Sequence, residues 1–371
     1  MSNKGKTVVV GLSGGVDSSV SAYILKEKGF NVIGLFMHNW EETFEDGVCS
    51  AEQDYEDVKR VSETLGIPYY SVNFAKEYLE RVFSEFLNEY KAGRTPNPDV
   101  LCNREIKFGP FLDYALAMGA DYIATGHYAR VEEKNGVYYL KKALDLNKDQ
   151  TYFLNQLNQK QLSKVIFPIG EMNKPDLRAL ARSIGLVTAD KKDSTGVCFI
   201  GERNFKKFLQ NYFPAKEGKI CSLDGKVVGT HNGVLYYTLG QRKGLNIGGY
   251  AGGNGKAWFV VKKDVKNNIL YVHQGEDDAL YSDYCYTEKF NFISGLPNGK
   301  NEFECMAKFR YRQQDQKVKV SVQEDGSTII TFEEPQRAVT PGQYAVLYLG
   351  DVCLGGAKIT QTFKKENLLH N

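Results

Sequence analysis

The sequence of 371 residues contains no long hydrophobic run. A membrane-spanning helix needs about 20 consecutive apolar residues, and no stretch approaches that length. The polar start, Met1–Lys6, leads into an apolar run that is too short for the core of a signal peptide, and no Arg- and Ser-rich transit peptide precedes it. These absences predict a cytoplasmic protein that does not contact a membrane.

The sequence also lacks any C-x-x-C pair, although it has seven cysteines. We therefore expect neither a zinc ribbon nor an iron–sulfur site of that spacing, and no resident metal ion. In a cytosolic protein these thiols stay mostly reduced. Five of them lie in sequence that does not distinguish them and are expected to be structural: Cys49, Cys221, Cys285, Cys305 and Cys353.

A strong net charge is absent as well, since the total is only +2. The charges are nevertheless unevenly distributed. Residues 1–130 have 13 basic and 19 acidic side chains, whereas residues 131–230 have 17 and 11. The change of sign is compatible with a nucleotide-binding part followed by a basic, RNA-binding face, and also with a solvated surface of random bias.

The first 130 residues alternate between short apolar runs, typical of buried parallel strands, and helical segments. Strands are predicted at Thr7–Leu12, Phe30–Met37, Tyr69–Phe74 and Asp121–Thr125, and helices at Val16–Lys28, Asp54–Leu65, Tyr78–Tyr90 and Pro110–Met118. This βαβ series predicts an α/β fold with a doubly wound parallel sheet.

Beyond residue 130 the pattern changes twice. A hairpin is expected around Asn135-Gly136, followed by mostly helical sequence up to residue 215. From Gly218 onward, Gly-containing turns separate short runs rich in Val, Tyr and Thr, which indicates one long or two small β domains. We predict a catalytic domain over 1–215, a small β-rich domain over 216–278 and a further β domain over 279–371.

The first predicted strand runs into a loop of glycines and serines that opens a helix. Glycine lets the backbone approach a phosphate, and a helix N-terminus adds N–H groups and partial positive charge. Asp17 is an anion within this anion site, which makes sense if it orients the loop or holds Mg²⁺. A Walker lysine and a G-x-G-x-x-G pattern are both missing. The loop residues are Gly11, Leu12, Ser13, Gly14, Gly15, Val16, Asp17 and Ser18.

The run Ser-Gly-Gly-x-Asp-Ser at residues 13–18 resembles the pyrophosphate loop (PP-loop) of the ATP pyrophosphatase superfamily. That resemblance implies ATP as cosubstrate, with Mg²⁺ as its counter-ion. It also implies cleavage between the α and β phosphates, so that an oxygen of the second substrate is adenylated. The superfamily includes amidotransferases, synthetases and sulfur-transfer enzymes, and the loop alone does not choose among them.

Two cysteines lie in polar, basic loops. Pro96 and Pro98 are expected to keep the segment before Cys102 extended rather than helical, and Arg104 and Lys107 favour a thiolate at Cys102.

The second of these cysteines is Cys198. It lies between Gly196 and Gly201, with Lys191 and Arg203 nearby, which again favours a thiolate. A single cysteine is most often a small buried residue. Two thiols in such surroundings indicate chemistry instead.

Both cysteine segments, with four further motifs, resemble the tRNA-specific 2-thiouridylases. The matches extend from Gly11 to Arg312 and so cover almost the whole chain. The further motifs are Gly126-His127-Tyr128-Ala129-Arg130, Asp149-Gln150-Thr151-Tyr152-Phe153-Leu154, Gly240-Gln241-Arg242-Lys243-Gly244 and Lys308-Phe309-Arg310-Tyr311-Arg312.

The resemblance implies thiolation of the 2-position of the wobble uridine in tRNAs for Lys, Glu and Gln, and a C-terminal β-barrel like that of translation factors. Cys198 would carry a persulfide and Cys102 would be the nucleophile that completes the transfer. The implied nucleotide pocket consists of Gly11 to Ser18, Met37 and Gly126. The implied tRNA contacts are Asn97, Pro98 and Asp99 at the target base, and Lys148, Asp149, Gln150, Arg310 and Tyr311 elsewhere. The side chains of Asn97 and Asp99 can hydrogen-bond a base edge, and Asp99 can move a proton.

This chemistry is coherent on its own terms. The 2-oxygen of uracil is a very poor leaving group until adenylation makes it part of AMP. The persulfide of Cys198 then supplies sulfur. Cys102 attacks the inner sulfur and leaves a disulfide, or free hydrosulfide is the attacker, and both routes stay open. The sulfur donor is a cysteine desulfurase or a relay protein.

Two alternatives compete with this interpretation. An amide-forming synthetase would need a source of ammonia and would leave both cysteine loops without a role. A non-catalytic RNA-binding protein would account for the basic middle and the β domains. It would not account for the loop at Ser13–Ser19 or for the thiols.

Overall fold

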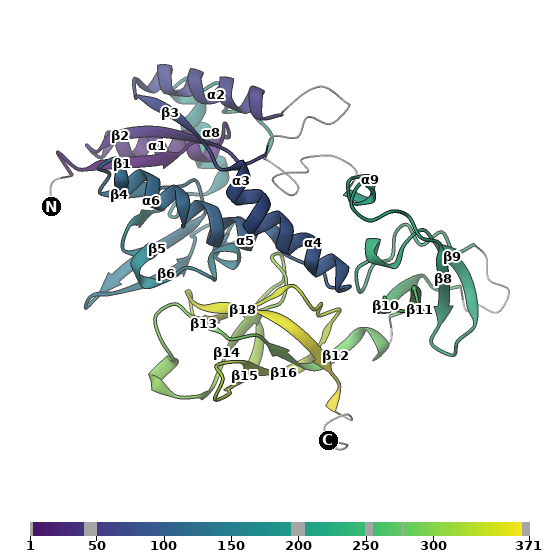
Figure 1. The fold of residues 1–371 in the computed structure, drawn as a ribbon. Coiled ribbons are helices and arrows are strands. Elements are labelled where there is room, and N and C mark those ends of the chain that lie inside the picture. The colour runs from purple at the N-terminus through teal and green to yellow at the C-terminus, as the bar shows by residue number, and fades with distance from the viewer. Residues whose placement is uncertain (1–2, 41–49, 194–204, 249–254, 277, 366–371) are drawn as a thin grey trace.

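The computed structural model describes residues 3–40, 50–193, 205–248, 255–276 and 278–365, and it contains three separate sheets (Figure 1). The first sheet is parallel and has the order β3-β2-β1-β4-β7. Its strands are β1 (Thr7–Gly11), β2 (Asn31–His38), β3 (Tyr69–Asn73), β4 (Tyr122–Ala124) and β7 (Val165–Ile166). The strand order reverses between β1 and β4, so the predicted doubly wound parallel sheet is confirmed, and such a reversal is where open sheets bind ligands.

Helices cover both faces of this sheet. The α-helices of the described residues, not all of which lie on this sheet, are α1 (Val16–Glu27), α2 (Ser50–Leu65), α3 (Ala75–Tyr78), α4 (Ser84–Lys91), α5 (Pro98–Cys102), α6 (Pro110–Ala117), α7 (Gln159–Leu162), α8 (Lys174–Ser183) and α9 (Phe205–Gln210). Val8 and Val10 of β1 pack in one core with α1, α2 and α8, whereas Val9 packs in the core of the opposite face, which includes Phe111 of α6. Burial on both faces explains why β1 is apolar throughout instead of alternating.

The hairpin predicted at Asn135-Gly136 is confirmed. It joins β5 (Ala129–Lys134) to β6 (Val137–Lys142), and both turn residues have positive φ, 54° and 78°. A two-residue turn of this kind suits the twist of antiparallel strands. β6 then pairs with a strand near the C-terminus, so this hairpin belongs to the third sheet.

The expectation of mostly helical sequence from the hairpin to residue 215 is wrong. Among the described residues, α7 and α9 have only 4 and 6 residues, and α8 has 10. Polar side chains hold the backbone in turns here. Asp145, for example, accepts hydrogen bonds from the backbone N–H groups of Asn147 and Lys174, each at 3.1 Å. Such side chains compete with the hydrogen bonds of a helix, and helical periodicity does not register them.

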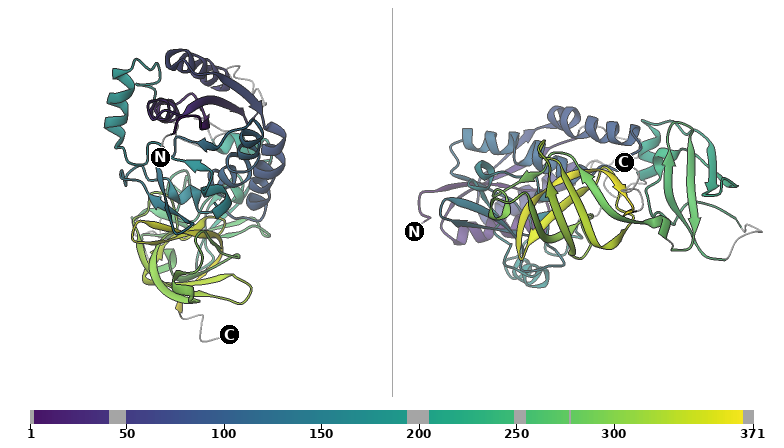
Figure 2. Two further views of the ribbon diagram at one scale, coloured as in Figure 1. Left: turned by 90° about the vertical axis from the view of Figure 1, so that its left-hand side faces the viewer. Right: turned by 90° about the horizontal axis from the view of Figure 1, so that it is seen from below.

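The second sheet has the order β10-β11-β8-β9, with β11 and β8 parallel. Its strands are β8 (Gly218–Ser222), β9 (Val227–His231), β10 (Trp258–Asp264) and β11 (Ile269–Gln274). Its own core includes Ile220, Val260 and Val272. In Figures 1 and 2 this region lies at one end of the molecule, beside the other two.

The third sheet closes into a barrel of six strands in the order β12-β16-β15-β14-β17-β18, with β18 pairing back to β12. The bounds are β12 (Tyr281–Thr287), β13 (Asn291–Phe292), β14 (Glu302–Lys308), β15 (Gln316–Val322), β16 (Thr328–Arg337), β17 (Tyr344–Leu349) and β18 (Val352–Phe363). β13 pairs with β18 outside this ring, and the hairpin β5–β6 extends the sheet. Closure leaves the six-stranded ring without an open edge, and the predicted C-terminal β-barrel is confirmed.

The barrel is firmly docked against the first region (Figure 2). Lys358 of β18 forms ion pairs with Glu85 and Glu89 of α4, at 3.0 and 3.1 Å. Glu89 is buried and also accepts a two-point ion pair from Arg94. Burial raises the pKa of Glu89, but the hydrogen bonds from Arg94 and Lys358 outweigh it and hold that pKa below its usual value.

No helix among the residues described is long and apolar enough to cross a membrane.

Candidate active site

The loop between β1 and α1 is shaped by close backbone packing. Gly14 has φ +72°, and a Cβ there would lie 2.5 Å from the carbonyl oxygen of Asp54 in α2. Gly126, which follows β4, packs on the other side of the loop, because a Cβ there would lie 2.7 Å from the backbone nitrogen of Ser18. Both contacts exclude a side chain. The sequence motif is therefore also a packing requirement.

Ser18 organises the loop from within. Its hydroxyl accepts a hydrogen bond from the backbone N–H of Ser13 at 3.2 Å and donates to the carbonyl of Gly15 at 3.1 Å. Gly15 is extended and precedes α1 directly, so the loop leads into the first turn of that helix. Leu12 and Val16 are buried, and only their backbone can serve a ligand. This arrangement suits the binding of phosphate oxygens by backbone N–H groups.

Met37 and Gly126, which the family resemblance assigns to the nucleotide pocket, lie beside this loop. The methyl group of Met37 in β2 lies 3.7 Å from the Cβ position of Gly11. After Gly126 the chain continues into His127, whose buried ring packs at 6.0 Å from the ring of Phe108. Burial holds the pKa of His127 well below its usual value, and the charge of Lys107 lowers it further. The lowered pKa favours the neutral form of this ring, which also packs against Phe167.

Asp17 is compensated by partners that the sequence analysis missed. Its carboxylate accepts hydrogen bonds from Lys174 Nζ at 2.7 and 2.9 Å and from the hydroxyl of Tyr128 at 3.2 Å. Lys174 begins α8 and is buried. The ion pair reduces the repulsion that Asp17 would exert on a phosphate. Tyr128 lies in a recognised motif, whereas Lys174 is 157 residues away from Asp17 and stands in no motif.

Lys174 also reaches Asp193, at 2.7 Å, and Asp193 further pairs with Lys148 and Arg178, at 2.8 and 2.9 Å. Burial raises the pKa of Asp193, but the hydrogen bonds from Lys148 and Lys174 outweigh it and lower the pKa to about 2. Asp193 is therefore an anion at any physiological pH. Through Lys174, Asp193 is linked to Asp17 of the loop, and it is the last described residue before 194–204.

The side chains around the loop fit Mg²⁺ as a counter-ion of ATP. Among the residues that the structure describes, no group of three or more His, Cys, Asp or Glu side chains could hold a metal ion. Asp17 is a single carboxylate at the loop, about one third exposed, and oxygen is the ligand that Mg²⁺ prefers. Both oxygens of this carboxylate also accept hydrogen bonds from Lys174.

The prediction that the segment before Cys102 is not helical is wrong. Residues Pro98–Cys102 form α5, which continues through a π-helical turn at Asn103–Lys107 toward α6. Pro98 occupies the first helical position, where an N–H is not needed and the fixed φ of proline is favourable. Asn97 is the N-cap, and its side-chain oxygen accepts a hydrogen bond from the N–H of Val100 at 3.3 Å. Pro and Asn here begin a helix instead of preventing one.

Asp99 and Cys102 are therefore three residues apart on one short helix. Cys102 is buried, at 2% exposure. Burial raises the pKa of Asp99, and the charge of Lys107 opposes that shift. A carboxyl group whose pKa is raised exchanges protons more readily near neutral pH. Arg104, expected to favour a thiolate, is engaged with Glu105 at 2.6 Å.

The residues expected to contact tRNA have different surroundings. Asp149 is buried and accepts hydrogen bonds from Ala143 N–H and from the hydroxyl of Thr151, at 3.0 and 2.7 Å. The side chain of Gln150 accepts from the N–H of Tyr128 at 2.9 Å. In this conformation the side chains of Asp149 and Gln150 both make hydrogen bonds within the protein.

Arg310 and Tyr311 follow β14 of the barrel, and they differ in exposure. Arg310 is exposed. Tyr311 is half-buried, with its ring centroid 4.4 Å from that of Phe153. Phe153 also joins the barrel side to the α5 region, because its carbonyl accepts a hydrogen bond from Asn103 at 3.0 Å.

Cys198 and its neighbours at 194–204 lie outside the described residues, as does Cys49. Cys198 follows Asp193 by five positions in the sequence. Four other thiols, Cys221, Cys285, Cys305 and Cys353, are buried and unbridged. Burial raises the pKa of Cys305 and of Cys353 to about 12, which makes them unreactive, as expected of structural cysteines.

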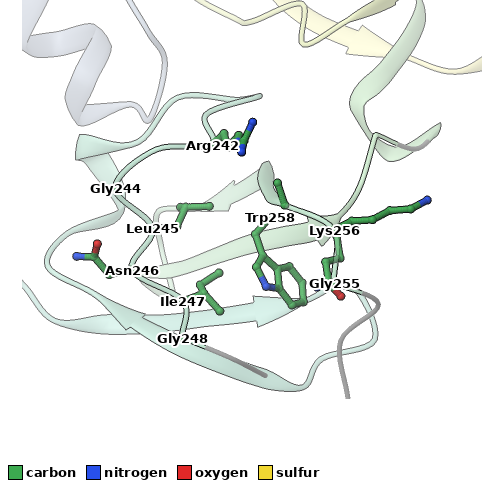
Figure 3. Close-up of a pocket in the computed structure, with 11 residues that line it drawn as sticks. Arg242, Gly244, Leu245, Asn246, Ile247, Gly248, Gly255, Lys256 and Trp258 are labelled. Carbon is green, nitrogen blue, oxygen red and sulfur yellow. The ribbon is translucent and has the colours of Figure 1, made fainter. Parts of the chain in front are cut away.

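A separate hollow of about 500 Å³ opens in the second sheet region (Figure 3). It is lined by Arg242, Gly244, Leu245, Asn246, Ile247, Gly248, Gly255, Lys256, Ala257, Trp258 and Gln274. Arg242 and Gly244 come from one of the recognised motifs, but none of the predicted site residues lies here. The candidate site is therefore at the loop after β1 and not in this hollow.

A parallel sheet whose first strand leads into a glycine- and serine-rich loop, at the reversal of strand order, defines the class: a nucleotide-binding α/β enzyme domain. Family models agree. Residues 6–202 match the "tRNA methyl transferase HUP domain", residues 206–274 the corresponding PRC-barrel domain, and residues 282–359 an aminomethyltransferase β-barrel domain.

Curated relatives specify the family. The chain is 60% identical to a tRNA-specific 2-thiouridylase of Geobacillus kaustophilus, covering 98% of both chains. It is 58% identical to one of Staphylococcus aureus, covering 100% of this chain and 99% of the relative. The chain belongs to the tRNA-specific 2-thiouridylase family, and the term methyl transferase in the domain descriptions does not fit these relatives. A 4-thiouridine synthetase in complex with RNA and ATP is only 17% identical, with a TM-score of 0.34 over 56% of this chain and 49% of that one, too low to inform the site.

The close packing of Gly14 predicts a selective effect of a methyl group. In Gly14→Ala the new Cβ meets the backbone of Asp54 and the positive φ is strained, so the loop must shift. We expect the KM for ATP to rise at least about tenfold, which corresponds to ~1.4 kcal/mol. Gly29→Ala is the matched control, because Gly29 has φ +82° but nothing within 4 Å of its Cβ position. An equal loss of ATP binding in both variants would contradict the proposed role of the packing.

Proposed function

We propose that this protein catalyses the ATP-dependent 2-thiolation of the wobble uridine in tRNAs for Lys, Glu and Gln, releasing AMP and pyrophosphate. The observation that carries the proposal is the ion-pair chain that joins the loop at residues 11–18 to Asp193 through Lys174, because Asp193 precedes Cys198 by five positions. On the other face of the sheet, Cys102 of α5 lies in the same buried core as Val9 of β1. Identity of 58–60% to 2-thiouridylases over the whole chain supports the proposal.

The loop would bind the phosphates of ATP through backbone N–H groups and the hydroxyls of Ser13 and Ser18. Lys174 neutralises Asp17 at a distance of 2.7 Å, so the loop can accept an anion. Mg²⁺ comes as the counter-ion of ATP, where it neutralises phosphate charge. The 2-oxygen of uridine attacks the α phosphate, pyrophosphate leaves, and the oxygen becomes part of AMP.

Sulfur would then replace that oxygen. The terminal sulfur of a Cys198 persulfide forms a bond to C2, and AMP leaves with the oxygen. The Cys102 thiolate next attacks the sulfur of Cys198, leaving thiouridine and a Cys102–Cys198 disulfide that a thiol reductant reopens. Alternatively, Cys102 releases hydrosulfide from the persulfide, with the same disulfide, and hydrosulfide attacks C2. We assign the proton transfer at the base to Asp99, whose pKa is raised by burial.

The substrate would bridge the sheet region and the barrel. We assign Asn97, Pro98 and Asp99 to the target base, which must leave its stack to be reached. Lys148, Asp149, Gln150, Arg310 and Tyr311 are assigned to the remaining tRNA surface. A cysteine desulfurase or relay protein supplies the sulfur. The division into parts over 1–215, 216–278 and 279–371 and the cytoplasmic location stay predictions.

The first test is the stoichiometry of the reaction. With tRNA, ATP, Mg²⁺ and a persulfide source, the protein should form 2-thiouridine, AMP and pyrophosphate in equal amounts. Asp17→Ala should abolish turnover while the protein stays folded, because Lys174 keeps its ion pair with Asp193 and the change removes no core volume. Nucleotide chromatography and mass analysis of digested tRNA are the measurements. ADP and phosphate as products, or pyrophosphate release without any change in the tRNA, would refute the proposal.

The second test separates the two thiols. Cys198→Ser should carry no persulfide and form no thiouridine. Cys102→Ser should still load labelled sulfur on Cys198 and yet fail to complete the transfer, because its nucleophile is missing. Mass analysis of tryptic peptides locates the label. Cys353→Ser is the control, since that thiol is buried and its pKa is about 12. Label on Cys102 in the wild type, with an active Cys198→Ser, would reverse the two roles.

The third test concerns the barrel. Arg310→Ala should weaken tRNA binding and reduce the slope of log affinity against log salt by about one, as expected for one lost phosphate contact. Tyr311→Phe, which keeps the packing against Phe153, should weaken binding less than Tyr311→Ala. ATP affinity should stay unchanged in all three variants. Lys319→Ala, an exposed lysine on β15, is the control. If the slope of log affinity against log salt were equal for Arg310→Ala and the wild type, Arg310 would not contact a tRNA phosphate.

A further inference from the structure

A short segment, Ala189–Asp193, runs past the phosphate loop and is fastened at both ends; we term it the strap. Arg178 of α8 holds it on one side. Its guanidinium donates to the carbonyls of Ala189 and Lys191, at 2.6 and 2.9 Å, and to the carboxylate of Asp193 at 2.9 Å. The strap is the last described part of the chain before residues 194–204.

Lys191 fastens the strap to the loop itself. Its Nζ donates to the carbonyl oxygen of Gly14 at 2.9 Å, to Asp54 at 2.7 Å and to Asp57 at 2.6 Å. An ammonium group has three donors, so all three are used. Asp54 and Asp57 lie on α2, and Asp57 is mostly buried. One cation therefore joins the loop, α2 and the strap.

The contact with Gly14 also sets the direction of a loop N–H group. In a trans peptide the carbonyl and the following N–H point to opposite sides, and none of the described peptide bonds is cis. With the carbonyl of Gly14 held by Lys191, the N–H of Gly15 points away from Lys191. A loop that binds phosphate depends on such fixed N–H directions. Losing Lys191 would free this peptide to rotate.

We propose that Lys191 is a positioning residue that couples ATP use at the loop to sulfur delivery from Cys198. It orients the Gly14–Gly15 peptide toward the nucleotide, and it fastens the strap to that loop. Lys191 precedes Cys198 by seven positions, so the residue that orients the loop is also close in sequence to the residue that would carry the sulfur. The inference rests on the proposed function, in which the adenylated base and the persulfide must meet.

The test compares coupling in Lys191→Met and in the wild type, as 2-thiouridine formed per AMP. Lys191→Met should raise the KM for ATP about tenfold, the size expected for a lost charged hydrogen bond. It should also lower the ratio of thiouridine to AMP to below about half, because the adenylate is hydrolysed before sulfur arrives. Persulfide loading of Cys198 should stay at the wild-type level, since it needs no nucleotide. Lys191→Arg should restore much of the ratio.

Arg182→Met is the matched control, because Arg182 pairs with Asp190 of the same strap and both side chains are exposed. It should behave as the wild type does. If Lys191→Met does not fold, Asp57→Asn serves instead, since it weakens one of the three contacts, and it should shift KM and the ratio in the same direction. An unchanged ratio in the folded Lys191 or Asp57 variant, or an equal loss in Arg182→Met, would overturn the inference. A wild type that forms no AMP with tRNA would instead refute the proposed function.

Discussion

The structure depends on the compensation of one negative charge in a site built for anions. Asp17 lies in the loop whose glycines and helix N-terminus suit phosphate, and uncompensated it would repel the ligand. Lys174 provides the compensation from α8 and binds Asp193 at the same time. The folding of α8 against α1 therefore completes the loop and also fixes the strap. One ion-pair network thus joins the loop to the last described residues before the segment that contains Cys198.

Local features of the sequence are sufficient to predict the loop. The ends of β1 and α1 lie within a residue of those expected, because the glycines and the apolar run act over a few neighbouring residues. Lys174, Lys191 and Asp193 cannot be identified from sequence as partners of the loop. Lys174 and Lys191 contact it across more than 150 residues of sequence, and Asp193 reaches it only through Lys174. Nothing in their local sequence differs from that of solvated charges. Only the fold makes them part of the site.

The segment before Cys102 departs from its prediction for a different reason. Two prolines favour an extended chain, and a proline does exclude helix at the residue before it. Pro98, however, stands at the first turn, where its fixed φ assists the helix, and Asn97 caps it. The same residues fit both conformations, and tertiary packing decides between them, since Val100, Leu101 and Cys102 complete a buried core. Periodicity over five residues carries too little information for that choice.

The barrel contacts the segment before α5 directly, and under the proposed function this contact would link tRNA binding to the chemistry. Gln343, just before β17, donates to the carbonyls of Thr95 and Pro96 at 2.8 and 3.1 Å, and the N–H of Thr95 donates to the carbonyl of Pro341 at 3.0 Å. These bonds fix the backbone immediately before Asn97, the cap of the helix that carries Asp99 and Cys102. Under the proposed function, a tRNA that contacts the barrel would act on a body already joined to that helix. The barrel would then contribute to the position of the reacting groups as well as to affinity.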